Sequence, residues 1–495
     1  MKLFKKYRLS KNVFANISQA IASTILMLIM YRYISDVLDV AMLGIWSVVI
    51  ATISASRLID IGFSSAVTYF IAKFNAQKNF KAISETIDTL VLVIMILLSV
   101  LMPFLYLLLK FILGYIFDSE DLEIALKILP FSLVSFWFII IASLFQGALD
   151  GLQRMPLRAV LNVTSQLLLL IFIFINVPKY GIVGLAIAQI YQGIYLFIFG
   201  RLMIMRFVKN LKLLPVYIKF NIIKQMYSYG GNVQLSSLLQ LIQEPLTKGL
   251  VASFGGALIA GYYEMAYQIV TRIRSFLIIA NNAVVPHVSS LKETTPNQVK
   301  HLFVQNFKLM LIFSIAIYCM LNLWAGGIVS FFLKGNQPYE FVFIFKILII
   351  AWGINTISAP PYFFNMGDGR VWHNTKCQLL ISFLNILLAI FFGYYFRWEG
   401  VILGSSLAVI IGSLYLIISY RIDNESILKM INLKLTMQSF FVTLIYTLFY
   451  IYGWFYTLNL YSDSFLYIAL IIIVPISLLC FFIYYNPLIR KILRN

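Results

Sequence analysis

Charged side chains within long apolar segments are the residues of this sequence best suited to chemistry. Arg57 and Asp60 lie three positions apart in one such segment, and Arg272 and Arg274 follow Glu264 in another. A charge near the centre of a bilayer costs about 2.5–3.5 kcal/mol on insertion scales. Each of these residues is therefore expected to be compensated by a partner or retained for a function.

The arginines suggest an anionic substrate. Arginine presents a fixed fork of donors that fits phosphate oxygens, and it stays charged when it loses water. Arg272 and Arg274 are about 200° apart around a helix, so they do not point the same way. Arg57 and Asp60 share a helical face, so Asp60 either neutralises Arg57 or carries a coupling ion.

Two segments also carry many uncharged polar side chains. The segment 12–34 contains Asn16 and Gln19, and the segment 225–253 contains Gln240, Gln243 and the Glu244-Pro245 pair. Polar groups in hydrocarbon should face water or protein, which predicts a cavity wall. The alternative is that they hold helices together. Glu244 and Glu264 are candidates for ion coupling or charge pairing, and Pro245 for a gating bend, although packing also tolerates proline.

Composition identifies the elements that position these residues. The chain is 61% hydrophobic and 12% charged, with a mean hydropathy of +0.90. Its apolar runs reach the length of about 20 residues that a membrane helix needs. The sequence thus predicts an all-α polytopic membrane protein with about 14 spans. Besides 12–34 and 225–253, these include 257–290, 371–395, 399–420, 435–458 and 464–485. Its three cysteines and three histidines are dispersed, so no disulfide, metal or cofactor is expected.

The distribution of Lys and Arg predicts the orientation. They concentrate in connections that lie inside if the N-terminus is inside, which accounts for the net charge of +19. Both termini are then expected in the cytoplasm. Nucleic-acid binding is not expected, because topology and anionic lipid already require a basic inner face. The cations expected within spans are Arg57, Arg272, Arg274 and Lys308.

A weak internal repeat divides the chain. An offset of about 217–219 residues places Gly44 on Gly261, Arg57 on Arg274, and Asp150-Gly151 on Asp368-Gly369. Blocks of six spans have the same orientation, so the repeats should be related by a pseudo-two-fold axis along the membrane normal. The expected parts are an N-terminal lobe (1–206), a cytoplasmic amphipathic linker (207–223), a C-terminal lobe (224–421), and a segment with spans 13 and 14 and a cytoplasmic tail (422–495).

The stretch Leu43-Gly44-Ile45-Trp46-Ser47, followed by Leu58-Ile59-Asp60-Ile61-Gly62-Phe63, resembles polysaccharide repeat-unit flippases. These belong to the multidrug/oligosaccharidyl-lipid/polysaccharide exporter superfamily. Leu43 departs from the tyrosine usual before the glycine. The resemblance covers essentially the whole chain. It implies two lobes that alternate between inward- and outward-facing states, with cationic cavity residues at the positions of Arg57, Arg272 and Arg274.

The resemblance also implies a substrate and a location. Undecaprenyl-pyrophosphate-linked oligosaccharide, such as an O-antigen or capsule repeat unit, would move from the inner to the outer leaflet of the cytoplasmic membrane. A polysaccharide polymerase and other assembly proteins would be partners. One alternative is a multidrug or cation antiporter of the same superfamily, although arginines would repel its cargo. A membrane polymerase or ligase is the other, but the chain has no large loop to hold an acceptor. No catalytic residues are therefore expected.

Overall fold

The computed structural model describes residues 2–427, except for 57–62, 209–210, 213–214, 216–218, 220–234, 283, 295 and 423–424. Arg57, Asp60 and the predicted spans 435–458 and 464–485 lie outside the described residues. The chain divides into two compact units. Unit 1 is 1–268 with 332–336 and 382–405, and unit 2 is 269–331 with 337–381 and 406–495.

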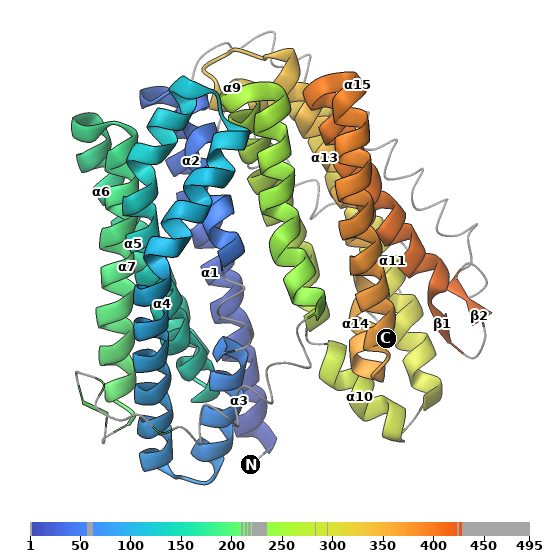
Figure 1. Ribbon diagram of the computed structural model, residues 1–495. Coiled ribbons are helices and arrows are strands. Elements are labelled where there is room, and N and C mark those ends of the chain that lie inside the picture. Colours follow the sequence, from blue (N-terminus) through green and yellow to red (C-terminus); the bar gives the residue numbers. More distant parts are fainter. Residues whose placement is uncertain are drawn as a thin grey trace, which may run out of the picture. The chain divides into compact units, whose positions relative to one another are not determined.

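Unit 1 is built from long helices (Figure 1). They are α1 (Lys2–Val37), α2 (Val40–Ala55), α3 (Phe63–Ala76), α4 (Phe80–Ile116), α5 (Ser119–Gly151), α6 (Met155–Tyr180), α7 (Ile182–Met205) and most of α9 (Leu235–Asn282). Helix α5 packs against α2, α3, α4 and α7, while α6 packs against α1 and α7. The core of unit 1 therefore surrounds α5, about half of whose residues are buried.

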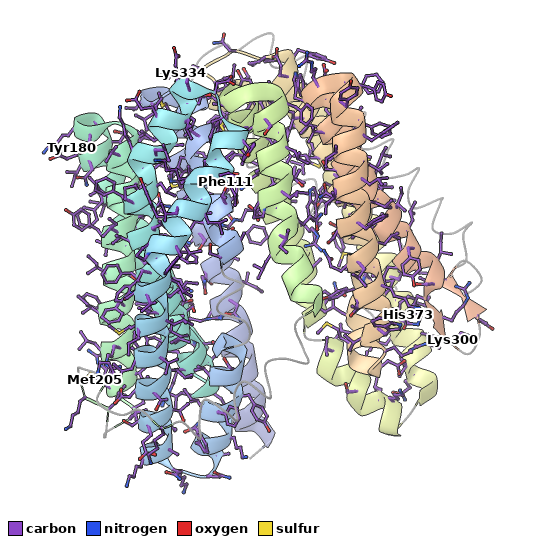
Figure 2. All side chains as sticks on the ribbon, in the orientation of Figure 1. Phe111, Tyr180, Met205, Lys300, Lys334 and His373 are labelled. Atoms are coloured by element: carbon purple, nitrogen blue, oxygen red, sulfur yellow. The ribbon has the colours of Figure 1, made fainter. Side chains whose placement is uncertain are left out.

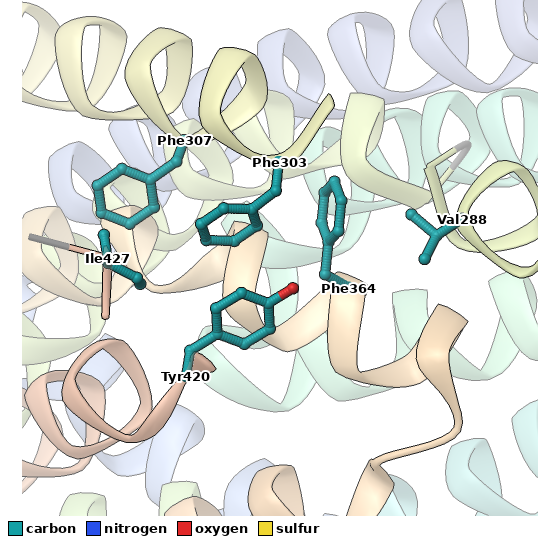
Figure 3. Close-up of a cluster of buried hydrophobic side chains, with 6 residues drawn as sticks. All are labelled: Val288, Phe303, Phe307, Phe364, Tyr420 and Ile427. Atoms are coloured by element: carbon teal, nitrogen blue, oxygen red, sulfur yellow. The ribbon is translucent and has the colours of Figure 1, made fainter. Parts of the chain in front are cut away.

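Unit 2 contains the end of α9, α10 (Val284–Thr294), α11 (Pro296–Leu323), most of α12 (Ala325–Phe332), α13 (Tyr339–Ile357) and α14 (Ala359–Asp368). Both ends of α15 (Val371–Ser419) also belong to it, followed by the short antiparallel strands β1 (Arg421–Ile422) and β2 (Glu425–Ser426). An aromatic cluster attaches the chain after α15 to α11 and α14 (Figure 3). In it, the ring of Phe303 stacks on Tyr420 at 4.4 Å and meets Phe364 edge-on at 5.1 Å.

Local backbone geometry marks where predicted spans meet. Gly256 has φ of 78° inside α9, between the predicted spans 225–253 and 257–290. Glycine adopts this conformation without the steric cost of a Cβ atom. A similar break at Phe396 and Arg397 divides α15 between the spans predicted at 371–395 and 399–420. Each of these two helices therefore contains two predicted spans.

Eight of the described helical segments are long and apolar enough to cross a membrane. Large apolar side chains cover their outer surfaces, including Phe111 on α4 and Tyr180 at the end of α6 (Figure 2). Helices suit this environment because they satisfy their own backbone hydrogen bonds. The chain is a multi-pass membrane protein. Helix α9 is not one of the eight, and it carries Glu244, Lys248, Glu264, Arg272 and Arg274.

The part of the predicted linker that the structure describes is attached to α4 and α7. Arg201 pairs with Asp88 at 2.7 Å, and both side chains are almost fully buried. Arg201 Nη2 also donates to the backbone oxygen of Lys212 at 2.8 Å. Further along, Lys219 pairs with Glu85 at 2.7 Å. These contacts hold the chain leaving α7 against the neighbouring helix ends.

Candidate functional site

Two glycines that the internal repeat equates lie in direct contact within unit 1. A Cβ atom at Gly44 of α2 would lie 1.9 Å from the backbone oxygen of Ala257 in α9. A Cβ atom at Gly261 of α9 would lie 2.1 Å from the backbone oxygen of Val40 in α2. Both distances are far below van der Waals contact, so only glycine permits this helix crossing.

The crossing is symmetric with respect to the repeat. Val40 and Ala257, like Gly44 and Gly261, are separated by about 217 positions in the sequence. Gly44 therefore contacts Ala257, and its counterpart Gly261 contacts Val40, which is the counterpart of Ala257. This reciprocal pattern is what a two-fold axis produces at a contact between equivalent surfaces. The pseudo-symmetry predicted from the sequence thus has a physical contact at α2 and α9.

A polar cavity of about 250 Å³ lies beside this crossing, within unit 1. We call it the axial cavity. Helices α1, α2 and α9 form its wall, and its lining includes Tyr31, Trp46, Ser47, Glu244, Lys248 and Glu264. Because α9 turns at Gly256, both of its halves reach the same cavity, and they bring Glu244 and Glu264 to one place.

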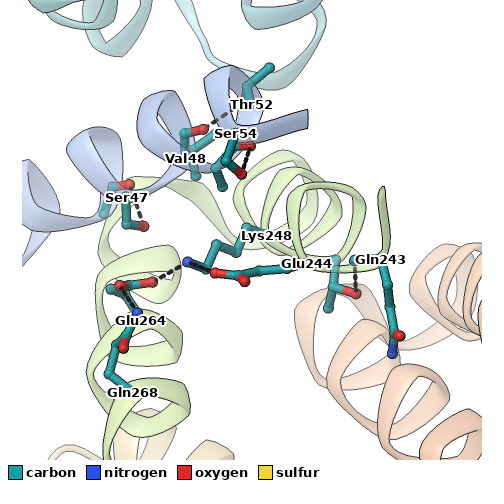
Figure 4. Close-up of polar contacts among 12 residues, drawn as sticks. Ser47, Val48, Thr52, Ser54, Gln243, Glu244, Lys248, Glu264 and Gln268 are labelled. Atoms are coloured by element: carbon teal, nitrogen blue, oxygen red, sulfur yellow. Dashed lines mark hydrogen bonds and ion pairs between the residues drawn. The ribbon is translucent and has the colours of Figure 1, made fainter. Parts of the chain in front are cut away.

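Lys248 lies between the two carboxylates (Figure 4). Its Nζ atom is 2.6 Å from Glu244 Oε1 and 2.6 Å from Glu264 Oε2. Glu264 is further held by Tyr31, whose hydroxyl donates to Oε1 at 2.6 Å, and by Gln268 Nε2 at 3.0 Å. Lys248 and Glu264 are buried, whereas the Glu244 side chain is 38% exposed. The buried charges are therefore paired and hydrogen-bonded, as burial requires.

The two repeats contribute different chemistry to the axial cavity. Tyr31 is the repeat equivalent of Lys248, and Ser47 is the repeat equivalent of Glu264, at the same separation of about 217 positions. The first repeat thus supplies hydroxyl groups where the second supplies an ammonium and a carboxylate. The resulting ionic triad of Glu244, Lys248 and Glu264 has two negative charges and one positive charge.

Of the site residues predicted from the sequence, the structure brings Glu244 and Glu264 together. Lys248 was missed, because the membrane cations were identified as the arginines and Lys308. Its spacing was the available signal, since a lysine four positions after a glutamate lies on the same helical face. Gln243 is adjacent to Glu244 on α9, and its backbone oxygen accepts a hydrogen bond from Thr247 at 2.9 Å.

Two other predicted residues of the polar spans, Asn16 and Gln19, lie outside the axial cavity. Asn16 accepts a hydrogen bond from Arg158 at 3.0 Å, and Arg158 pairs with Asp150 at 2.8 Å. Gln19 Oε1 is buried without a hydrogen-bond partner among the described residues. The side chain of Gln240 lies outside the described part of the chain. At Pro245 the backbone is helical, and Gly256 is the non-helical residue of α9.

The predicted arginine pair belongs to unit 2. Arg274 Nε donates to Asn355 Oδ1 at 2.7 Å, and its guanidinium lies 5.2 Å from the ring of Trp352. Asn355 is itself fixed by a hydrogen bond of 2.9 Å to Ser413. These contacts orient the guanidinium plane.

Arg272 has no ion-pair partner among the residues that the structure describes. Arg57 and Asp60 lie outside those residues.

The chain has the fold of several solved transporters. It aligns with the lipid II flippase MurJ in an inward closed conformation, with a TM-score of 0.66, 20% identity, and coverage of 97% of this chain and 99% of that chain. For an inward-facing multidrug resistance MATE family transporter of the MOP superfamily, the TM-score is 0.65, with 15% identity and coverage of 81% and 92%. A MOP superfamily transporter from Pyrococcus furiosus aligns with a TM-score of 0.57, 16% identity, and coverage of 83% and 94%.

These likenesses show the fold, while a family model gives the membership. The chain matches no curated protein sequence. A family model described as polysaccharide biosynthesis protein matches residues 9–292, which is more than half of the chain. That match includes α2, α9 and most of α1, and hence the whole axial cavity. The chain therefore belongs to the polysaccharide biosynthesis protein family.

Proposed function

We propose that the protein is a flippase for polyprenyl-pyrophosphate-linked oligosaccharides. It would carry repeat units of a surface polysaccharide, such as an O-antigen or capsule, from the inner to the outer leaflet of the cytoplasmic membrane. The observation that carries this proposal is the match of the polysaccharide biosynthesis family model to residues 9–292, which include the axial cavity at the contact between the two repeats. Membership of the polysaccharide biosynthesis protein family supports the choice of a glycan as cargo.

The glycine crossing gives the proposal a mechanism of alternating access. With both termini inside, Val40 and Ala257 begin the second and eighth spans at the outer surface. The contact of Gly44 and Gly261 then closes the outer side of the cavity. Small residues at a helix crossing let the two backbones approach closely, so this crossing depends on close van der Waals packing of α2 against α9. Separation of α2 from α9 would open the cavity to the outer leaflet.

The orientation itself makes a testable prediction. A reporter that works only in the cytoplasm should be active when it is fused after Asn495. A reporter that works only outside should be active when it is inserted between Phe117 and Ile124. The connection between α4 and α5 is short and acidic, which suits the outer side. Cytoplasmic activity of the reporter at 117–124 would contradict the orientation.

Binding of the pyrophosphate is assigned in this proposal to Arg57, Arg272 and Arg274. Arg274→Lys keeps one positive charge but loses the planar fork, so it should keep partial function. Arg274→Ala removes both, and a hydrogen bond to a charged group contributes about 1.5–3 kcal/mol, enough to weaken binding about tenfold or more. Surface polysaccharide should therefore fall from wild type to Lys to Ala at constant protein level.

Arg57→Ala is expected to match Arg274→Ala, because the repeat equates the two positions. Lipid-linked repeat units should accumulate on the inner leaflet in both variants. Normal export by both alanine variants would show that the arginines do not bind the substrate, whatever the cargo is.

A multidrug or cation antiporter is the second candidate, and the net negative charge of the ionic triad favours it. Its cargo would be a small organic cation rather than a lipid-linked glycan. Efflux of a cationic dye from cells that contain the protein, with no change in surface polysaccharide on deletion, would support this alternative over the flippase.

A further inference from the structure

The polar surface of the axial cavity consists mainly of hydrogen-bond acceptors. The hydroxyl groups of Ser47 and Ser54 donate to backbone oxygens, at 3.0 Å and 2.7 Å. Their single donors are thus used, and their oxygens can act only as acceptors for a ligand. Trp46 Nε1 donates to Gln189 at 3.3 Å. The ammonium of Lys248 is held by two carboxylates. Tyr31 and Gln268, which also line the cavity, donate to Glu264. Each of these polar groups therefore directs at least one donor to the protein itself.

Glu244 is the charged group that a ligand in the cavity would meet. Its side chain is 38% exposed, whereas Glu264 and Lys248 are 3% and 5% exposed. The triad as a whole carries one excess negative charge. Electrostatic interactions are strong in a site of low dielectric, so this charge discriminates between ligands of opposite sign.

The lipid-linked substrate offers two kinds of group to such a wall. Phosphate and carboxylate oxygens only accept hydrogen bonds and carry negative charge, so the cavity disfavours them. Sugar hydroxyls and a sugar ammonium donate hydrogen bonds, which Glu244 and the serine oxygens accept. Trp46 and Ile50 supply apolar wall for the carbon face of a ring. A ligand that combines hydrogen-bond donors with an apolar ring face therefore complements this surface.

The size of the cavity limits the ligand further. Pockets for drug-sized ligands occupy about 300–1,000 Å³. The axial cavity has about 250 Å³, which suits a single sugar ring rather than a complete oligosaccharide.

We propose that the axial cavity is a sugar-recognition site that accepts a neutral sugar or, better, an amino sugar of the repeat unit, and rejects an acidic one. This inference rests on the proposed function, because it assigns part of the same substrate. The pyrophosphate then binds outside this cavity. Glu244 selects the sugar by its charge, and Lys248 with Glu264 fixes the position of Glu244.

Saturation-transfer NMR of the purified full-length protein tests the proposal with three probes: methyl glucosaminide, methyl glucoside and methyl glucuronide. The expected order of affinity is glucosaminide, glucoside, glucuronide. Glu244→Gln removes the exposed charge, so it should weaken glucosaminide binding about tenfold and reduce the discrimination against glucuronide. The matched control is Glu123→Gln, whose carboxylate pairs with Lys127 at 2.7 Å on the exposed surface of α5. It should leave the order unchanged.

The outcomes separate this inference from the proposed function. Equal binding of the three probes by the wild type, or preference for glucuronide, overturns the sugar site even if Glu244→Gln does not fold. An unchanged order in a folded Glu244→Gln variant also overturns it. If the expected order is found but the protein translocates no lipid-linked glycan, the sugar site stands and the flippase assignment fails.

Discussion

Gly261→Ala should abolish most glycan export while the protein remains in the membrane at its normal level. The added Cβ atom would lie 2.1 Å from the backbone oxygen of Val40, which has no rotamer by which to move away. Helices α2 and α9 would have to separate, and the outer side of the axial cavity could not close. Overpacking costs about 1–3 kcal/mol, which shifts a two-state equilibrium about 5–150-fold. Gly44→Ala should have a similar effect, because its clash with Ala257 is equivalent.

Gly114→Ala is the matched control, because a Cβ atom there meets nothing within 4 Å. All three substitutions raise helix propensity equally, so they differ in the clash alone. Surface polysaccharide and membrane protein level should be measured together in the three variants. Wild-type export by Gly44→Ala and Gly261→Ala would contradict the closing role of the crossing.

Lys248→Met is expected to have the largest effect on stability. Removing the ammonium leaves Glu264, which is 3% exposed, next to Glu244 without a positive partner. Breaking a buried ion pair by removing one partner costs about 3–5 kcal/mol. The protein level in the membrane and the melting temperature in detergent should therefore both fall. Glu264→Gln alone should be milder, because Lys248 keeps Glu244 as its partner.

The double variant Lys248→Met with Glu264→Gln separates charge from packing. It removes the buried ammonium together with the buried carboxylate, and replacing a whole buried pair is often neutral. Most of the lost stability should return, which a double-mutant cycle measures directly. If Lys248→Met is as stable as the wild type, the triad is not the buried ion network described above.

Periodicity and composition were sufficient to predict much of the fold. The apolar runs predicted helical spans, and the connection expected between 253 and 257 coincides with Gly256. The offset of about 217 positions identifies Gly44 and Gly261 as equivalents, and the structure places them at one helix crossing. Local sequence carries such information because helix boundaries and repeats depend on residues close in the chain or on a constant offset.

The partners of the charged residues were less predictable. Glu264 receives its hydrogen bond from Tyr31, a residue more than 200 positions away, and no sequence pattern pairs these two. Asn16 was expected in a cavity because an amide side chain without a hydrogen-bond partner is costly in lipid. In the structure, Arg158 supplies that partner. Polar groups in a span need a partner, and the sequence does not specify whether this is water, substrate or a neighbouring helix.

Translocation of a lipid-linked glycan by the purified protein tests the central claim most directly. Proteoliposomes would contain a fluorescent polyprenyl-pyrophosphate-linked oligosaccharide, and an external lectin that does not cross the bilayer would report the glycan in the outer leaflet. Wild-type protein should make the glycan of both leaflets accessible, whereas Gly261→Ala should leave the inner pool protected, as in liposomes without protein. Equal protection with wild-type protein and with empty liposomes would contradict the assignment as a flippase.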